Sequence, residues 1–183
     1  MFELAQNPAV QELLHQKVKE TVEQNESMDY CDLIINNIPY LDAVVKETLR
    51  KYPPLAELTR QVTVDKYQMK DITLKKDTVV IVPSYAIHHC PDYYPDPEKF
   101  DPNRFMPENK HLLVPNTYMP FGQGPRNCIG MRFAYQELNL CLARLALKYQ
   151  FHLTPNTPTK MTFSPIMPIL RSPDYQLKLS KRD

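Results

Sequence analysis

The chain has 183 residues, of which 43% are hydrophobic and 23% are charged, and its formal net charge is +1. This length and composition predict one globular domain with a substantial core. The mixed charge pattern excludes the basic footprint of a nucleic-acid-binding protein. The longest continuous apolar run, "VVIV" at 79–82, is too short to cross a membrane, and the first residues lack the pattern of a signal peptide.

The four cysteines, Cys31, Cys90, Cys128 and Cys141, form no C-x-x-C pair. Their spacing fits neither a zinc knuckle nor a disulfide framework. A reducing compartment is therefore the simpler interpretation.

Helical patterns dominate the first fifty residues. Residues 7–24 predict a helix that begins around Asn7 and Pro8, because asparagine suits a helix cap and proline suits the first helical position. Residues 39–51 predict a second helix with an apolar face, and the two prolines that follow Tyr52 end it.

The second half of the chain changes character. Residues 59–82 are rich in β-branched residues between short polar turns, which predicts a small antiparallel sheet. Residues 91–120 are rich in proline and predict an irregular coil. A third helix is predicted over residues 131–150, and alternation near the carboxyl terminus predicts short strands. The pattern predicts a mainly α protein with small β-sheets, in the α+β class.

The third helix carries an apolar stripe at Ala134, Leu138, Cys141, Leu142, Leu145 and Tyr149. These positions share one face of an α-helix, so this face is expected to pack on the core. Cys141 is accordingly predicted to be a core residue.

All three glycines lie in "FGQGPRNCIG", residues 121–130. Because glycine lets other atoms approach the backbone closely, this segment predicts a tight loop pressed against another group. Cys128 stands just before the third helix, whose amino end, together with Arg126, favours the thiolate form. A thiolate can serve as a nucleophile or as a metal ligand, while a buried cysteine at a helix start is the structural alternative.

The surroundings of Cys128 separate these chemistries. No nearby His or Asp has an obvious place as the base for a nucleophile, and the Gly-Lys-Ser/Thr of a phosphate loop is missing. Zinc would need more Cys or His ligands nearby. A single thiolate on a close-approach loop suits a haem iron, with Arg126 available to meet a propionate.

Two further pairs of residues are candidates for a structural or functional role. Glu47 and Arg50 share one helix face, where an exposed pair would contribute little to stability. A partly buried Arg50 would need more acceptors than one carboxylate offers, and the proline-rich coil is their expected source. His88 and His89 would point to opposite faces of a strand, so a structural or propionate-side role is expected rather than a shared metal ion.

The segment "FGQGPRNCIG" resembles the haem-binding signature F-x-x-G-x-R-x-C-x-G of the cytochrome P450 family. "ETLR" resembles the family's E-x-x-R at Glu47 and Arg50. "DPNRF" is similar to the family's P-E-R-F segment, with Asn103 where the family usually has Glu. The amino-acid sequence around these motifs most resembles that of eukaryotic microsomal members that oxidise drugs and steroids.

The resemblance covers essentially the whole chain and implies the C-terminal part of the cytochrome P450 fold. Residues 7–24, 39–51 and 131–150 correspond to the J, K and L helices, residues 59–82 to the β1 sheet and residues 91–120 to the meander, with the Cys-ligand loop before the L helix. Residues 1–183 are then expected to be a C-terminal fragment of a single domain, without the distal helix and the amino-terminal membrane anchor.

The resemblance also assigns roles to residues. Cys128 is the axial ligand of the haem iron, and the cofactor-binding set is Cys128, Arg126, Arg60, Phe121, Gly122, Gly124 and Gly130. Glu47, Arg50 and Arg104 form a structural salt-bridged trio. The residues expected to line the substrate site are Pro54, Leu55, Ala56, Leu58, Ile166 and Met167.

By the same resemblance, the function is that of a haem-thiolate monooxygenase that inserts one atom of O₂ into a small lipophilic substrate. The cofactor is haem b (iron protoporphyrin IX), and electrons come from NADPH through NADPH-cytochrome P450 reductase. Its expected place is the cytosolic face of the endoplasmic reticulum membrane. Alternatives are a non-catalytic truncated fragment and a haem-thiolate isomerase, and the 183-residue chain alone is expected to be inactive.

Four lysines, Lys17, Lys19, Lys46 and Lys51, are candidates for a basic face that meets the reductase. Charges on helices are also the ordinary mark of a solvated face.

Overall fold

The structure, a computed structural model, describes residues 1–25, 38–163, 169–172 and 174–182. Of the residues singled out above, Cys31, Ile166 and Met167 lie outside the described residues.

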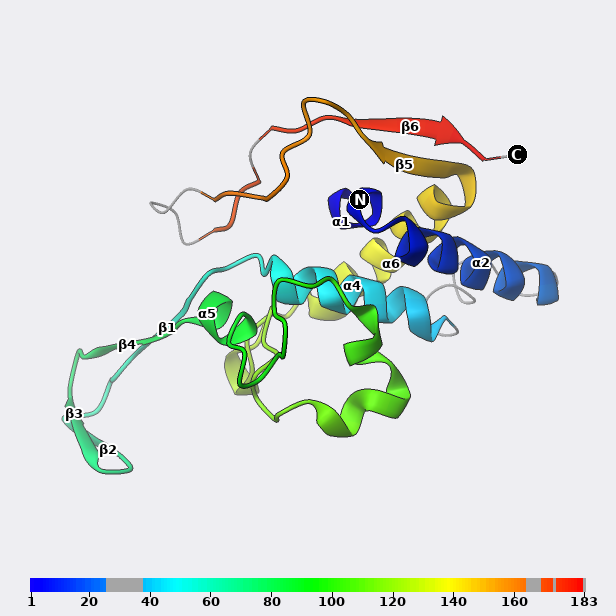
Figure 1. The fold of residues 1–183 in the computed structure, drawn as a ribbon. Coiled ribbons are helices and arrows are strands. Elements are labelled where there is room, and N and C mark those ends of the chain that lie inside the picture. The colour runs from blue at the N-terminus through cyan, green and yellow to red at the C-terminus, as the bar shows by residue number, and fades with distance from the viewer. Residues whose placement is uncertain (26–37, 164–168, 173, 183) are drawn as a thin grey trace.

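Three long helices form the body of the molecule (Figure 1). They are α2 (Pro8–Gln24), α4 (Pro39–Lys51) and α6 (Met131–Lys148), and a short helix α1 (Phe2–Gln6) precedes them. Pro8 occupies the first turn of α2 as predicted, but the Asn7 side chain does not cap that helix and instead donates to the carbonyl of Glu3 at 2.8 Å. The core between the helices includes Leu14, Val18, Leu41, Val44, Ala143 and Ala146.

The helix α6 is where the sequence predicted it, and Leu142 and Leu145 of the predicted stripe pack against the core, but the prediction was wrong at other positions of that stripe and Tyr149 begins β5. The buried residues are Asn139, Ala143 and Ala146, whereas Leu138 and Cys141 are exposed. Small alanine side chains let a neighbouring helix approach closely, and α6 uses them against α2 and α4. Cys141 is therefore not a core residue.

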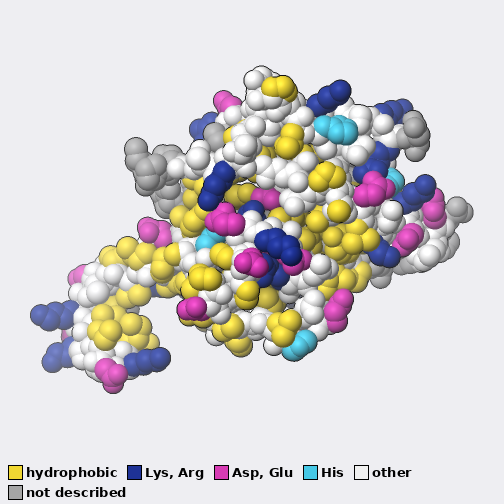
Figure 2. Space-filling view, viewed as in Figure 1, with side chains coloured by type: hydrophobic (Ala, Val, Ile, Leu, Met, Phe, Trp, Pro, Cys, Tyr) yellow, Lys and Arg dark blue, Asp and Glu magenta, His cyan; other side chains and the backbone are white. Residues whose placement is uncertain are grey.

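The predicted antiparallel sheet is confirmed as two separate pairs of strands. Strand β1 (Leu58–Gln61) pairs with β4 (Val79–Val82), and β2 (Lys66–Met69) pairs with β3 (Ile72–Lys75). Together they form an arm that extends away from the helices (Figures 1 and 2). A third pair, β5 (Tyr149–Leu153) with β6 (Leu177–Lys181), continues from the end of α6.

The proline-rich segment is irregular, as predicted, with α5 (Ser84–His88) before it and short 3-10 turns within it. These turns are η1 (Pro102–Phe105) and η2 (Pro107–Leu112), and η3 (Gly124–Arg126) lies in the glycine loop. Tyr94, Phe100 and Phe105 are each less than 8% exposed and hold the coil against the helices. This coil leads directly into the loop that carries Cys128.

Candidate functional site

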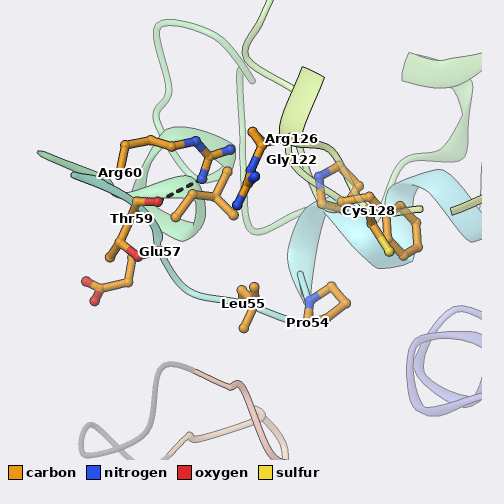
Figure 3. Close-up of a pocket in the computed structure, with 11 residues that line it drawn as sticks. Pro54, Leu55, Glu57, Thr59, Arg60, Gly122, Arg126 and Cys128 are labelled. Atoms are coloured by element: carbon orange, nitrogen blue, oxygen red, sulfur yellow. Dashed lines mark hydrogen bonds between the residues drawn. The ribbon is translucent and has the colours of Figure 1, made fainter. Parts of the chain in front are cut away.

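A cavity of about 600 Å³ lies between the glycine loop and the segment that follows α4 (Figure 3). It is lined by Pro54, Leu55, Glu57, Leu58, Thr59, Arg60, Pro120, Phe121, Gly122, Arg126 and Cys128. Most of its wall is apolar, and the polar side chains among the lining residues are those of Cys128, Arg60, Arg126, Glu57 and Thr59. This volume lies in the range of small-molecule and cofactor sites.

Backbone hydrogen bonds shape the loop that carries Cys128. The Gly122 N–H donates to the Met119 carbonyl at 3.1 Å, and the Cys128 N–H donates to the Phe121 carbonyl at 2.9 Å. Gly122 and Gly124 have φ of +75° and +76°, a conformation that favours glycine. The loop thus folds back on itself and leaves the Cys128 side chain exposed at the cavity wall.

Aromatic packing fixes the loop against α6. The ring of Phe121 meets the ring of Tyr135 edge to face, with 5.2 Å between centroids. The hydroxyl of Tyr135 lies 3.0 Å from that of Tyr118. Burial raises the pKa of both phenols, so they stay neutral and serve as hydrogen-bonding groups.

Two arginines from different segments converge on one part of the cavity. Figure 3 shows Arg60, on β1, and Arg126, in η3, with their guanidinium groups pointing toward one another, while the Glu57 side chain points away from them. Arg60 Nη1 donates to the Thr59 carbonyl at 2.7 Å. Among the described residues neither arginine forms an ion pair, so the two positive charges are available to an anion.

The buried cluster around Glu47 and Arg50 lies outside this cavity. Both side chains are 0% exposed, and Arg50 donates from Nε and Nη2 to the two Glu47 oxygens at 2.8 and 2.9 Å. Arg104 Nε lies 3.6 Å from Glu47 Oε1, so the three residues of the expected trio lie together. Burial raises the pKa of the Glu47 carboxyl, and the hydrogen bonds from Arg50 offset part of that rise.

The coil supplies further partners of this cluster, as expected from the sequence. Arg50 donates to the carbonyl of Pro97 at 2.8 Å, and the Asp101 N–H donates to Glu47 at 2.9 Å. The cluster therefore joins the end of α4 to the coil that leads to Cys128.

The two adjacent histidines lie at the end of a short helix rather than in a strand, which corrects the geometry expected above. His88 is the last residue of α5 and is 0% exposed. His89 stacks on Tyr85, with 4.1 Å between ring centroids. Burial, opposed only in part by the hydrogen bond to Arg50, lowers the pKa of His88 to about 4.

The four lysines do not form the basic face considered above. Lys17 and Lys19 pair with Glu20 and Glu23, Lys46 pairs with Asp42, and the buried Lys51 pairs with Glu3 at 2.8 Å. Each positive charge thus has a carboxylate beside it, so these residues offer no unpaired positive surface.

The structure brings together most of the cavity residues expected from the sequence. These are Cys128, Arg126, Arg60, Phe121, Gly122, Pro54, Leu55 and Leu58. Ala56, Gly124 and Gly130 do not line the cavity, and the carbonyl of Ala56 accepts a hydrogen bond from the Tyr85 N–H at 2.9 Å. The sequence analysis did not name Glu57, Thr59 and Pro120, which also line the cavity. The only indication in the sequence was that each is adjacent to a predicted site residue.

The chemistry of the cavity fits a haem group. In the described parts of the chain, no group of three or more His, Cys, Asp or Glu side chains is placed to hold a metal ion. A thiolate at Cys128 would suit the iron of haem, because the macrocycle supplies most of the ligands of that iron. The apolar wall suits the macrocycle, and the two unpaired arginines suit its carboxylates.

Comparisons with known proteins identify the family of the chain. A sequence model of the family described as cytochrome P450 matches residues 1–179. Cytochrome P450 9e2 of Blattella germanica is 44% identical over 158 residues, which cover 85% of this chain and 29% of the relative. Cytochrome P450 3A7 of Homo sapiens is 38% identical over 185 residues, which cover 100% of this chain and 36% of the relative.

The family model and the curated relatives show that the chain belongs to the cytochrome P450 family. It spans about a third of the length of the curated relatives that it matches. Within the described ranges, no helix is both long and apolar enough to cross a membrane.

Proposed function

We propose that this chain is the haem-ligating part of a haem-thiolate monooxygenase, with Cys128 as the axial ligand of the iron of haem b. The observation that carries the proposal is an exposed thiol on the wall of a mostly apolar cavity that also holds two guanidinium groups, neither of which forms an ion pair with another described residue. Family membership supports the same assignment.

The residues of the cavity have distinct tasks in this proposal. Cys128 binds the iron as a thiolate, and Arg60 and Arg126 orient the cofactor by binding its propionates. Phe121, held by Tyr135, packs beside the sulfur and excludes water. Pro54, Leu55, Ala56 and Leu58, with Ile166 and Met167 from outside the described residues, are proposed to line the substrate site.

When bound, haem supplies the activation of O₂, and the thiolate ligand donates electron density that favours cleavage of the O–O bond. One oxygen atom enters a small lipophilic substrate, and electrons come from NADPH through NADPH-cytochrome P450 reductase. The proposed location is the cytosolic face of the endoplasmic reticulum membrane. Glu47, Arg50 and Arg104 serve structure rather than chemistry in this scheme.

The test uses the protein encoded by the longest reading frame that contains residues 1–183. Reduced and given carbon monoxide, it is expected to show the red-shifted Soret band of thiolate-ligated haem, and Cys128→Ser is expected to abolish that band. Cys141→Ser is the matched control, because Cys141 is also exposed but lies on α6 outside the cavity. An unchanged band in the Cys128→Ser protein would remove Cys128 as the ligand.

The reaction class needs a separate measurement. With ¹⁸O₂, NADPH and the reductase, a panel of small lipophilic compounds is expected to yield products that carry one labelled oxygen atom. Products without label would contradict monooxygenase chemistry while leaving the ligand assignment intact.

A further inference from the structure

We propose that His88 is a positioning residue for the Cys128 loop, which it links through hydrogen bonds to the buried Glu47–Arg50 pair. The proposal rests on the function proposed above only where it concerns haem ligation. The link itself is a set of contacts within this chain.

The first half of the link joins His88 to the end of α4. His88 Nδ1 lies 3.1 Å from the carbonyl oxygen of Arg50, and Arg50 Nη1 donates to the carbonyl of His88 at 2.9 Å. Each residue therefore uses its side chain to satisfy the backbone carbonyl of the other. The Arg50 carbonyl lies in the last turn of α4, where carbonyls have no partner within the helix.

The second half joins His88 to the segment that carries Cys128. The Met119 N–H donates to His88 Nε2 at 2.9 Å. The carbonyl of the same Met119 accepts from the Gly122 N–H at 3.1 Å, and the next turn closes with the bond from Cys128 N–H to Phe121. The position of Met119 thus determines where the turn before Cys128 begins.

These two contacts require one protonation state of the ring. A backbone carbonyl only accepts and a backbone N–H only donates, so Nδ1 must carry the proton and Nε2 must be bare. The imidazolium form would set an N–H of the ring against the N–H of Met119. The ring is buried among Arg50, Tyr94 and Tyr118, and the positive charge of Arg50 also favours the neutral form.

Ring stacking gives a parallel contact to the same loop. The His88 ring stacks on Tyr118, with 5.7 Å between centroids and 20° between planes. Tyr118 reaches Tyr135, which packs on Phe121 beside the glycine turn. A test of the hydrogen-bonded link must therefore keep an aromatic ring at position 88.

The experiment compares two variants. His88→Phe keeps a stacking ring and removes both hydrogen bonds of the side chain, whereas in His88→Gln the side-chain amide oxygen can again accept from the Met119 N–H. His89→Phe is the matched control, because among the described residues the ring of His89 forms its hydrogen bond within its own helix, at the Tyr85 carbonyl. All are made in the protein from the longest reading frame that contains the chain.

Hydrogen exchange is the readout that needs no haem. In His88→Phe the amides of Met119 and Cys128 are expected to exchange at least tenfold faster than in the wild-type protein. In His88→Gln they are expected to exchange more slowly than in His88→Phe, and in His89→Phe at the wild-type rate. Equal rates in wild type and His88→Phe would overturn the proposal.

A measurement on the wild-type protein covers the case in which His88→Phe does not fold. Its ¹⁵N spectrum is expected to show His88 as the neutral Nδ1–H tautomer at pH 7, and an Nε2–H tautomer or an imidazolium there would overturn the link. The carbon monoxide spectrum then separates the two proposals. A wild-type protein without the thiolate band contradicts the proposed function alone. In His88→Phe the band is expected to be weaker than in the wild type, because the loop that carries Cys128 is less well held, and a full band in this variant would contradict the role of His88 in positioning Cys128.

Discussion

Gly122 has a backbone conformation in the cysteine loop that L-residues rarely adopt. Its φ is +75°, and a Cβ built there would lie 3.7 Å from the Asn127 Cα. We expect Gly122→Ala to lower the free energy of unfolding by about 1–2 kcal/mol, because an L-residue is strained in this conformation. Urea unfolding with an unchanged m value measures the loss.

Two other glycines calibrate this prediction. Gly124 has φ of +76° with nothing within 4 Å of the built Cβ, so Gly124→Ala is expected to show the backbone strain alone. Gly130 has φ of −84°, and its built Cβ makes an ordinary contact, 3.9 Å from Cys128 Sγ. Gly130→Ala should therefore lower the free energy of unfolding by less than Gly122→Ala or Gly124→Ala does. A larger loss in Gly130→Ala would contradict the argument from φ.

At the scale of single residues, Arg50 shows what the sequence can and cannot predict. Its spacing from Glu47 predicted a pair on one helix face, and the need for further acceptors followed from the chemistry of a buried guanidinium. The acceptors are backbone carbonyls of His88 and Pro97. A carbonyl has no sequence signature, so their identity could come only from the structure.

At the scale of elements, one glutamine joins three of them. Gln11 on α2 is 2% exposed, and its Nε2 donates to the carbonyls of Leu4 in α1 and Phe151 in β5, both at 3.1 Å. Its Oε1 accepts from the Phe151 N–H at 2.6 Å. The side chain therefore satisfies three backbone groups that belong to two other elements.

We expect Gln11→Met to lower the free energy of unfolding by about 3 kcal/mol, because it leaves those backbone groups buried without partners while nearly preserving volume. Gln16→Met is the matched control, since Gln16 is exposed on the same helix and its loss should cost about 0.5 kcal/mol or less. Thermal or urea unfolding of the two variants measures the loss of stability in each. Equal stabilities would show that Gln11 does not join the elements.

The order and type of the main elements could be predicted from the sequence. The residues that α6 and α2 bury could be predicted only in part. The long helices and the antiparallel pairs follow from periodicity and from proline and glycine. Part of the buried face of α6 was missed because its fully buried residues are Ala143, Ala146 and Asn139, which weigh little in a hydrophobic pattern. Gln11 was missed because a glutamine on a helix ordinarily indicates an exposed position.

Several residues of the candidate site could be expected to lie together, because a short loop carries them. The motif placed Phe121, Gly122, Arg126 and Cys128 within eight residues of one another, so local geometry brings them together. Arg60 depends on the arm formed by β1 and β4, which no local pattern could position. Resemblance to a family supplied that residue, and the structure places it beside Arg126 (Figure 3).

At the scale of the whole molecule, large apolar side chains are exposed next to the candidate site. Ile129, directly after Cys128, is 104% exposed, and Phe133 at the start of α6 is 69% exposed. Yellow side chains also gather over the arm in Figure 2, where Ile81 is 53% exposed. Apolar surface of this kind marks places that a ligand or further protein covers.

This exposure leads to a prediction about the 183-residue chain on its own. We expect it to take up haem weakly and without one-to-one stoichiometry, because the described residues provide a thiol, two arginines and one apolar wall, while much of the macrocycle would remain in water. A haemin titration followed in the Soret region, with size-exclusion chromatography to detect self-association, measures this directly. The protein from the longest reading frame serves as the comparison and is expected to bind one haem tightly. Tight one-to-one binding by the isolated chain, with the thiolate band after reduction and carbon monoxide, would show that these residues enclose the cofactor by themselves.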